Sequence, residues 1–196
     1  MTLELFSRWS EVDVTLNGRR IGKYPTGGQH QFRAQLSLPY APGQLVIRGL
    51  EGGQVREELV LQTAGAVSEI RLSPDHSEIR PSRHALVFVE VSLCDDQGIV
   101  CAANQSEVNY EVRGPATIAG IGSGDLTDTA SYRANPRRVH HGRAIVIIRS
   151  TGEAGEIRLT AQSGALQAQA TIEARKPGPR PLRYRNRQRP STPRQP

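Results

Sequence analysis

Two pairs of adjacent acids are the residues whose types are best suited to catalysis. Glu57-Glu58 and Asp95-Asp96 could supply the two carboxylates that paired acid–base catalysis requires. Neighbouring residues of a strand point to opposite faces of the sheet, and neighbouring acids in a turn are usually solvated. We therefore expect neither pair to be catalytic, and the sequence predicts no catalytic residue elsewhere.

Ser123 and the pair His140-His141 are the candidates for a nucleophile, a base or a metal ligand. The glycines around Ser123 do not form the Gly-x-Ser-x-Gly turn of a nucleophile, and no helix follows that could bind phosphate. The glycines at positions 120, 122 and 124 are expected to supply positive φ angles in a tight connection. Adjacent histidines near a turn diverge, so we expect a surface pair, with no metal or cofactor bound.

The two cysteines, Cys94 and Cys101, flank the turn 95–98. If this turn closes a hairpin, Cys94 lies opposite Ile99 and Cys101 lies opposite Ser92. The two cysteines are then diagonal neighbours, about 7–8 Å apart, which is too far for comfortable disulfide geometry. We expect two free thiols in a reducing compartment.

Aromatic side chains could bind a sugar by stacking on its ring. Tyr110 alternates with two valines and is expected in the core, whereas Tyr40 lies between prolines and is expected to pack against its own turn. Trp9, Tyr24 and Tyr132 remain as weak candidates for sugar contacts. They lie on separate segments, so a dedicated sugar-binding platform is not expected.

Composition predicts an all-β chain. The 196 residues include 19 Gly and 13 Pro, which divide the sequence into short segments typical of strands and turns. An apolar run of about 18 residues, as a membrane helix needs, does not occur. The first residues lack the basic start and apolar stretch of a secretory signal, so a cytoplasmic location is the default expectation.

Charge is divided unevenly along the chain, whose net charge is +6. Residues 175–196 contain eight Lys or Arg and no acid, which leaves 17 basic and 19 acidic residues in 1–174. This Arg- and Pro-rich tail is expected to be disordered. It could bind nucleic acid through its charge, but a tail without a partner is the favoured interpretation.

Residues 1–65 are predicted to form five or six short strands. The segment 11–16 alternates polar and apolar residues and is followed by Asn17-Gly18, the strongest short hairpin signal. A second strand pair is predicted from 32–36 and 43–49, with the Pro-rich turn 39–43 between them.

Residues 66–174 are predicted to form an immunoglobulin-like sandwich. The most hydrophobic segment, 144–148, is expected to be a central strand, and 86–93 is a second apolar strand. The segments 156–161 and 165–172 are expected to close the domain as a hairpin.

Several motifs resemble the C-terminal modules of glycoside hydrolase family 2, of the β-galactosidase type. The run Val108–Asp125, together with Tyr132, Arg137-Arg138 and 141–152, is similar to the last β-sandwich of these enzymes. The hairpin at 12–18, the turn at 39–45 and Thr63-Ala64-Gly65 resemble the small domain that follows their catalytic barrel.

The resemblance implies two consecutive immunoglobulin-like β-sandwich domains, 1–65 and 66–174, before the tail 175–196. It also implies a structural role beside a catalytic barrel, so the chain alone would not be an enzyme. The partner would be the barrel of a family 2 glycosidase, with carbohydrate as a further possible partner and no membrane. The alternative is a freestanding sugar-binding or adhesion module.

Overall fold

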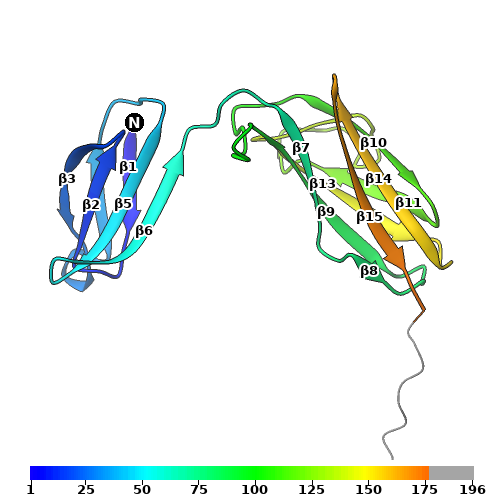
Figure 1. Ribbon diagram of the computed structural model, residues 1–196, viewed down its shortest axis with the longest axis horizontal. Coiled ribbons are helices and arrows are strands. Elements are labelled where there is room, and N and C mark those ends of the chain that lie inside the picture. The colour runs from blue at the N-terminus through cyan, green and yellow to red at the C-terminus, as the bar shows by residue number, and fades with distance from the viewer. Residues whose placement is uncertain (177–196) are drawn as a thin grey trace, which may run out of the picture.

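The computed structural model describes residues 1–176, and these form an all-β fold, as the sequence predicts. Figure 1 shows two β units that follow one another along the chain, joined between β6 and β7. The predicted disordered tail lies almost entirely outside the described residues. Within them, the one helix is the three-residue 3-10 turn η1 (Gly28–His30), far too short to cross a membrane.

The first unit contains six strands in two sheets, and the sheets differ in size. The small sheet pairs β1 (Thr2–Phe6) with β4 (Arg33–Ser37). The larger sheet has the order β3-β2-β5-β6. Its strands are β3 (Arg19–Pro25), β2 (Glu11–Leu16), β5 (Gln44–Glu51) and β6 (Gln54–Gln62).

The hairpin predicted at Asn17-Gly18 is confirmed, because both residues have positive φ angles, 50° and 77°, and β2 pairs with β3. The predicted pairing of 32–36 with 43–49 is wrong. β4 pairs with β1, whereas β5 pairs with β2 and β6. The Pro-rich segment carries the chain from one sheet to the other, so the apolar residues of β4 and β5 share one core instead of one ladder.

The second unit is an immunoglobulin-like sandwich. One sheet has the order β11-β13-β9-β7, which corresponds to the D-E-B-A order of that fold, and the other contains β10-β14-β15, which corresponds to C-F-G. The strands of the first sheet are β7 (Glu69–Pro74), β9 (Leu86–Cys94), β11 (Ala116–Gly122) and β13 (Arg143–Ser150). Those of the second are β8 (Glu78–Ile79), β10 (Glu107–Arg113), β12 (Arg137–Arg138), β14 (Gly155–Ser163) and β15 (Leu166–Ala174).

Alternating burial along the strands builds the core of the second unit. Val87, Val89 and Val91 of β9 are completely buried, and so are Ile157 and Leu159 of β14. β13 lies between β11 and β9, which confirms the predicted central position of the segment 144–148. The predicted closing hairpin is confirmed by the pairing of β14 with β15.

A buried carboxylate fastens the linker to the second unit. Asp95 is 2% exposed, and its Oδ2 accepts a hydrogen bond from the Gly65 N–H at 2.7 Å. Its Oδ1 accepts from the N–H groups of Gln97 (3.0 Å) and Ile99 (2.8 Å). The N–H donors of Gly65 and then Ile99 are the main reason that the pKa of Asp95 lies below its ordinary value. The expectation that Asp95 is solvated is therefore wrong, because backbone N–H groups of the turn and of the linker donate hydrogen bonds to both of its carboxylate oxygens.

The register at this turn also differs from the prediction by one residue. Cys94 lies opposite Val100, and the N–H of Cys101 donates to the carbonyl of Leu93. Both cysteines are free and buried, and burial raises the pKa of each thiol. The thiols are therefore neutral groups of the core near pH 7.

The three hydrogen bonds that Asp95 accepts from Gly65, Gln97 and Ile99 form a clasp, which Asp95→Asn tests through its pH dependence. The contribution of Asp95 to the free energy of unfolding is fully present above the ordinary carboxyl pKa and is lost as pH falls through the lowered pKa of the folded state. We expect the variant to be less stable at pH 7, with the difference shrinking below pH about 4. Urea unfolding over a pH series measures this. The exposed neighbour gives the control Asp96→Asn, and equal profiles for the two variants would contradict the clasp.

Gly114 has a positive φ of 93°, and a Cβ there would lie 2.0 Å from the carbonyl oxygen of Glu156. Gly164 also has a positive φ, 59°, but an added Cβ would meet nothing within 4 Å. Gly164→Ala should cost about 1 kcal/mol from the backbone alone. Gly114→Ala should cost at least about 3 kcal/mol, because β14 must also move. Urea unfolding of both variants measures the difference, and similar losses would show that the close contact is unimportant.

Candidate functional site

An apolar groove opens on the first unit between β1 and β6. Leu5, Phe6, Trp9, Ile47 and Leu59 line a hollow of about 290 Å³, with polar residues at its rim. Phe6 is 73% exposed and Leu59 is 52% exposed. Every residue of β6 is exposed, in contrast to its neighbour β5. The groove is therefore a part of the inner face of the larger sheet, near β6, that the smaller sheet does not cover.

Trp9 forms part of the groove wall and is held there by both its ring and its N–H. The indole packs on the backbone of β5, since a Cβ at Gly49 would lie 2.2 Å from Trp9 Cδ1. Its Nε1 donates a hydrogen bond to Glu57 Oε2 at 2.9 Å. The ring is thus fixed in place, and the groove has a preformed wall.

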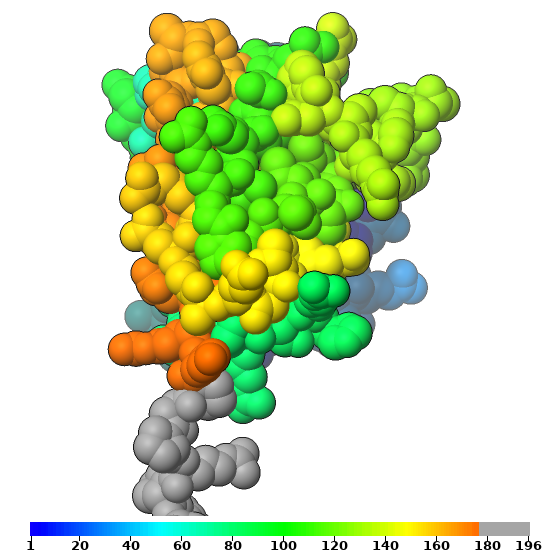
Figure 2. Space-filling model, turned by 90° about the vertical axis from the view of Figure 1, so that its right-hand side faces the viewer, coloured from blue at the N-terminus to red at the C-terminus, as the bar shows by residue number. Residues whose placement is uncertain are grey.

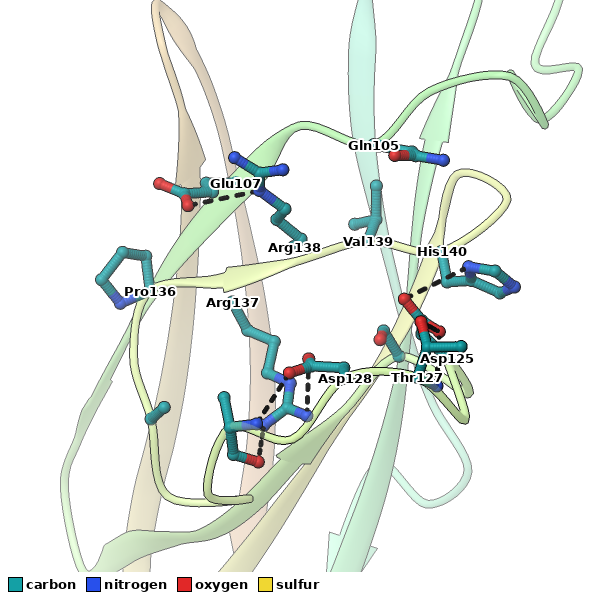
Figure 3. A pocket seen from close by; sticks show the side chains of 13 residues that line it. Gln105, Glu107, Asp125, Thr127, Asp128, Pro136, Arg137, Arg138, Val139 and His140 are labelled. Carbon is teal, nitrogen blue, oxygen red and sulfur yellow. Dashed lines mark hydrogen bonds and ion pairs between the residues drawn. The ribbon is translucent and has the colours of Figure 1, made fainter.

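A second, polar hollow of about 350 Å³ lies on the second unit (Figure 3). It is lined by β12 and by the loop 123–136 between β11 and β12, which we call the lobe. Figure 2 shows the lobe, in yellow-green, projecting from the second unit. The charged and polar residues that line the hollow are Gln105, Glu107, Ser123, Asp125, Thr127, Asp128, Arg137, Arg138 and His140.

The guanidinium of Arg137 braces the lobe from inside. It is 4% exposed and forms an ion pair with Asp128, with Nη2 2.8 Å from Oδ2. Its Nη1 donates to the carbonyls of Ser131 (2.7 Å) and Ala130 (3.3 Å), and the guanidinium lies 5.3 Å from the centre of the Tyr132 ring. Its Nε is buried without a partner among residues 1–176. The buried guanidinium thus contacts the side chain of Asp128, the carbonyls of Ala130 and Ser131, and the ring of Tyr132, and it holds this part of the lobe together.

Asp125 and His140 face each other across the hollow. Asp125 Oδ1 accepts two hydrogen bonds from Thr127, from Oγ1 at 2.7 Å and from the backbone N–H at 2.9 Å. These bonds lower the pKa of Asp125. Its Oδ2 lies 4.0 Å from His140 Nδ1, and each of the two side chains is about one-third exposed. The second carboxylate oxygen is therefore accessible from the hollow.

The three candidate sugar contacts are not brought together. Trp9 lies in the groove, Tyr24 packs against the core of the first unit, and Tyr132 is 71% exposed on the lobe of the second unit. Their role in sugar binding stays a prediction. Tyr110 is buried, as predicted, whereas Tyr40 is 65% exposed, so the expectation that it packs against its turn is wrong.

Two expectations about the lobe region are also corrected. Gly124 has a positive φ of 79°, but Gly120 and Gly122 lie within β11 without one. Tyr132 lies next to both glycines, but a Cβ at Gly122 would be in ordinary contact with its ring, at 3.6 Å, so the structure does not explain why these two positions are glycine. His141 is exposed, whereas His140 is half-buried and lines the hollow. The two rings do not diverge as expected, because their centroids are 4.1 Å apart.

Two family models match the chain. The model described as glycoside hydrolase family 2 C-terminal domain 5 matches residues 70–172, which is the sandwich that carries the lobe. The chain belongs to glycoside hydrolase family 2. A second model, a domain of unknown function named DUF4982, matches residues 1–57, which include most of the groove. The resemblance drawn from the motifs is therefore confirmed.

Known family 2 proteins are similar to nearly the whole chain. Beta-galactosidase BoGH2A from Bacteroides ovatus is 30% identical over 170 residues, which are 86% of this chain and 20% of that protein. A solved family 2 structure from Bacteroides cellulosilyticus is 31% identical, with a TM-score of 0.86 over 89% of this chain and 23% of that one. A β-glycosidase from Bacteroides vulgatus, 23% identical with a TM-score of 0.76 over 88% of this chain and 24% of that one, shares the fold.

The chain thus spans about a fifth of the curated family 2 relative that it matches. Sequence reasoning missed the hollow of this family 2 chain. The sequence motif that contains Arg137 does not indicate that this residue is buried, because Arg is mostly exposed. The one available signal was the length of the irregular lobe, since such long loops are uncommon unless they are functional.

Arg137→Met should destabilise the second unit by about 3 kcal/mol, because it leaves Asp128 and two carbonyls of the lobe without their donor. The control Arg138→Met removes an exposed cation and should cost less than about 0.5 kcal/mol. The double variant Arg137→Met, Asp128→Asn should cost less than the sum of its parts, since the orphan charge is removed. Urea unfolding of the original protein, these three variants and the single variant Asp128→Asn tests this, and an additive double variant would contradict the coupling between Arg137 and Asp128.

Proposed function

We propose that this chain is a non-catalytic accessory region of a family 2 glycosidase of the β-galactosidase type. In this role the groove of the first unit packs against the catalytic barrel of that enzyme. The observation that carries the proposal is the open groove, with its exposed apolar residues Phe6 and Leu59. Large exposed apolar surfaces mark sites of association.

The coverage of the relatives supports this assignment. In BoGH2A about four-fifths of the protein lies outside the part that matches this chain. The solved relative from Bacteroides cellulosilyticus superimposes on both units of the chain together. A surface that packs against the rest of such a protein would be apolar, and it would be exposed when this chain is on its own.

Three of the four acids in the two adjacent pairs are engaged in structural contacts, which supports a role without catalysis. A retaining glycosidase needs two carboxylates about 5–5.5 Å apart that flank the substrate. Glu57 accepts from Trp9, whereas Glu58 pairs with Arg48 at 2.6 Å. Asp95 is buried among backbone N–H groups. The catalytic pair would come from the barrel.

Association with BoGH2A that lacks its matched segment tests the proposal. Leu59→Asp, which places a charge in the groove, should weaken binding at least about tenfold. Val60→Asp is the matched control, because Val60 lies on the opposite face of β6 and is also exposed. Calorimetric titration gives the two dissociation constants. Absence of any association, or equal weakening by both variants, would contradict docking through the groove.

A further inference from the structure

The polar hollow contains a gap that a single oxygen atom fits. Asp125 Oδ2 and His140 Nδ1 are 4.0 Å apart, which is too long for a direct hydrogen bond. Oδ1 of the same carboxylate is already occupied by Thr127, so Oδ2 is the acceptor that is free to bind a ligand. When His140 carries a proton on Nδ1, a bridging hydroxyl satisfies both groups across such a distance, since it donates to the carboxylate and accepts from the ring N–H.

The walls of the hollow are fixed before any ligand binds. Arg137 ties Asp128 to the backbone of the lobe. At the far end of the lobe, the side-chain amide of Asn135 forms two hydrogen bonds with the backbone of Tyr110, at 3.0 and 2.7 Å. Sites for small molecules are usually preformed, and they start at about 300 Å³. The hollow has the size and the rigidity of such a site.

The charges of the hollow indicate the class of ligand. Arg137 is paired with Asp128 and Arg138 with Glu107, which leaves the free oxygen of Asp125 beside His140. An anion would be repelled by this carboxylate. A metal cation would find too few ligands, because residues 1–176 contain no group of three or more His, Cys, Asp or Glu side chains that could hold one. We propose that the hollow binds a neutral polyhydroxylated ligand, a single sugar unit, with one hydroxyl bridging Asp125 and His140.

Other polar groups around the gap can serve further hydroxyls of the same ligand. Gln105, with its side-chain amide, and Ser123, with its hydroxyl, line the same hollow as Asp125 and His140. Each can both donate and accept, as a sugar hydroxyl does. This site lies on the second unit, away from the groove, and its ligand is assayed on this chain alone. If no ligand binds in the hollow, the proposed docking role of the groove is unaffected. If the groove does not dock, the proposed sugar site is likewise unaffected.

Titration of the chain followed by amide NMR shifts tests the site. Methyl β-D-glucoside and methyl β-D-galactoside are the neutral probes, and glucuronate and sulfate are the anionic ones. At least one neutral glycoside should shift the amides of Asp125, Thr127 and His140 saturably, with a Kd of about 1 mM or lower. Asp125→Asn should weaken this binding about tenfold, because Asn keeps the oxygen that Thr127 needs and replaces the free acceptor by a donor.

The chain offers a matched control in a second Asp–His pair. Asp75 Oδ1 accepts from the Phe88 N–H, and its Oδ2 lies 3.2 Å from His76 Nδ1, in direct contact and outside the hollow. Asp75→Asn should leave glycoside binding unchanged, and an unchanged Tm of Asp125→Asn would show that the lobe is intact. The proposal is overturned if neither glycoside gives saturable shifts, if only the anions bind, or if the two Asn variants behave alike.

Discussion

The first unit packs a four-stranded sheet against a two-stranded one, and its exposed surface follows from this mismatch. β1 and β4 cover the apolar side chains of β2 and part of β5, which form the buried core. They do not reach β6, so Leu59 continues the apolar face of the sheet into solvent. A sandwich with equal sheets would have no groove, and the docking role proposed for the chain depends on it.

The second unit differs from the first, because its two sheets cover one another and enclose its core. The long connection from β11 to β12 adds no residue to the buried core, and its contacts with Arg137 hold it instead. A buried guanidinium replaces the apolar centre that such a loop lacks, and it satisfies carbonyls that no ladder reaches. Polar bracing leaves the inner wall of the lobe hydrophilic, which explains why the hollow is polar and the groove is apolar.

Local signals in the sequence predicted most of the elements, and contacts between distant segments accounted for the errors. The turn at Asn17-Gly18 depends on two residues, so it was predicted correctly, and so was the burial of Tyr110 by alternation. The partner of β4 depends on a strand that is 30 residues away, and the burial of Asp95 depends on Gly65. The boundary between the domains at 65 and 66, the tail and the sugar contacts stay predictions. The hollow is formed by segments that only the tertiary structure brings together.

The open edge of β6 also affects how the chain behaves at high concentration. The first half of the strand contains the charges of Arg56, Glu57 and Glu58, whereas Leu59–Leu61 is an uninterrupted apolar run. An edge strand with unpaired backbone groups and apolar side chains is a template for pairing with another chain, and charged residues are the usual protection. Only half of this edge is protected in that way. The apolar half of this edge is therefore the part of the first unit most prone to self-association at high concentration.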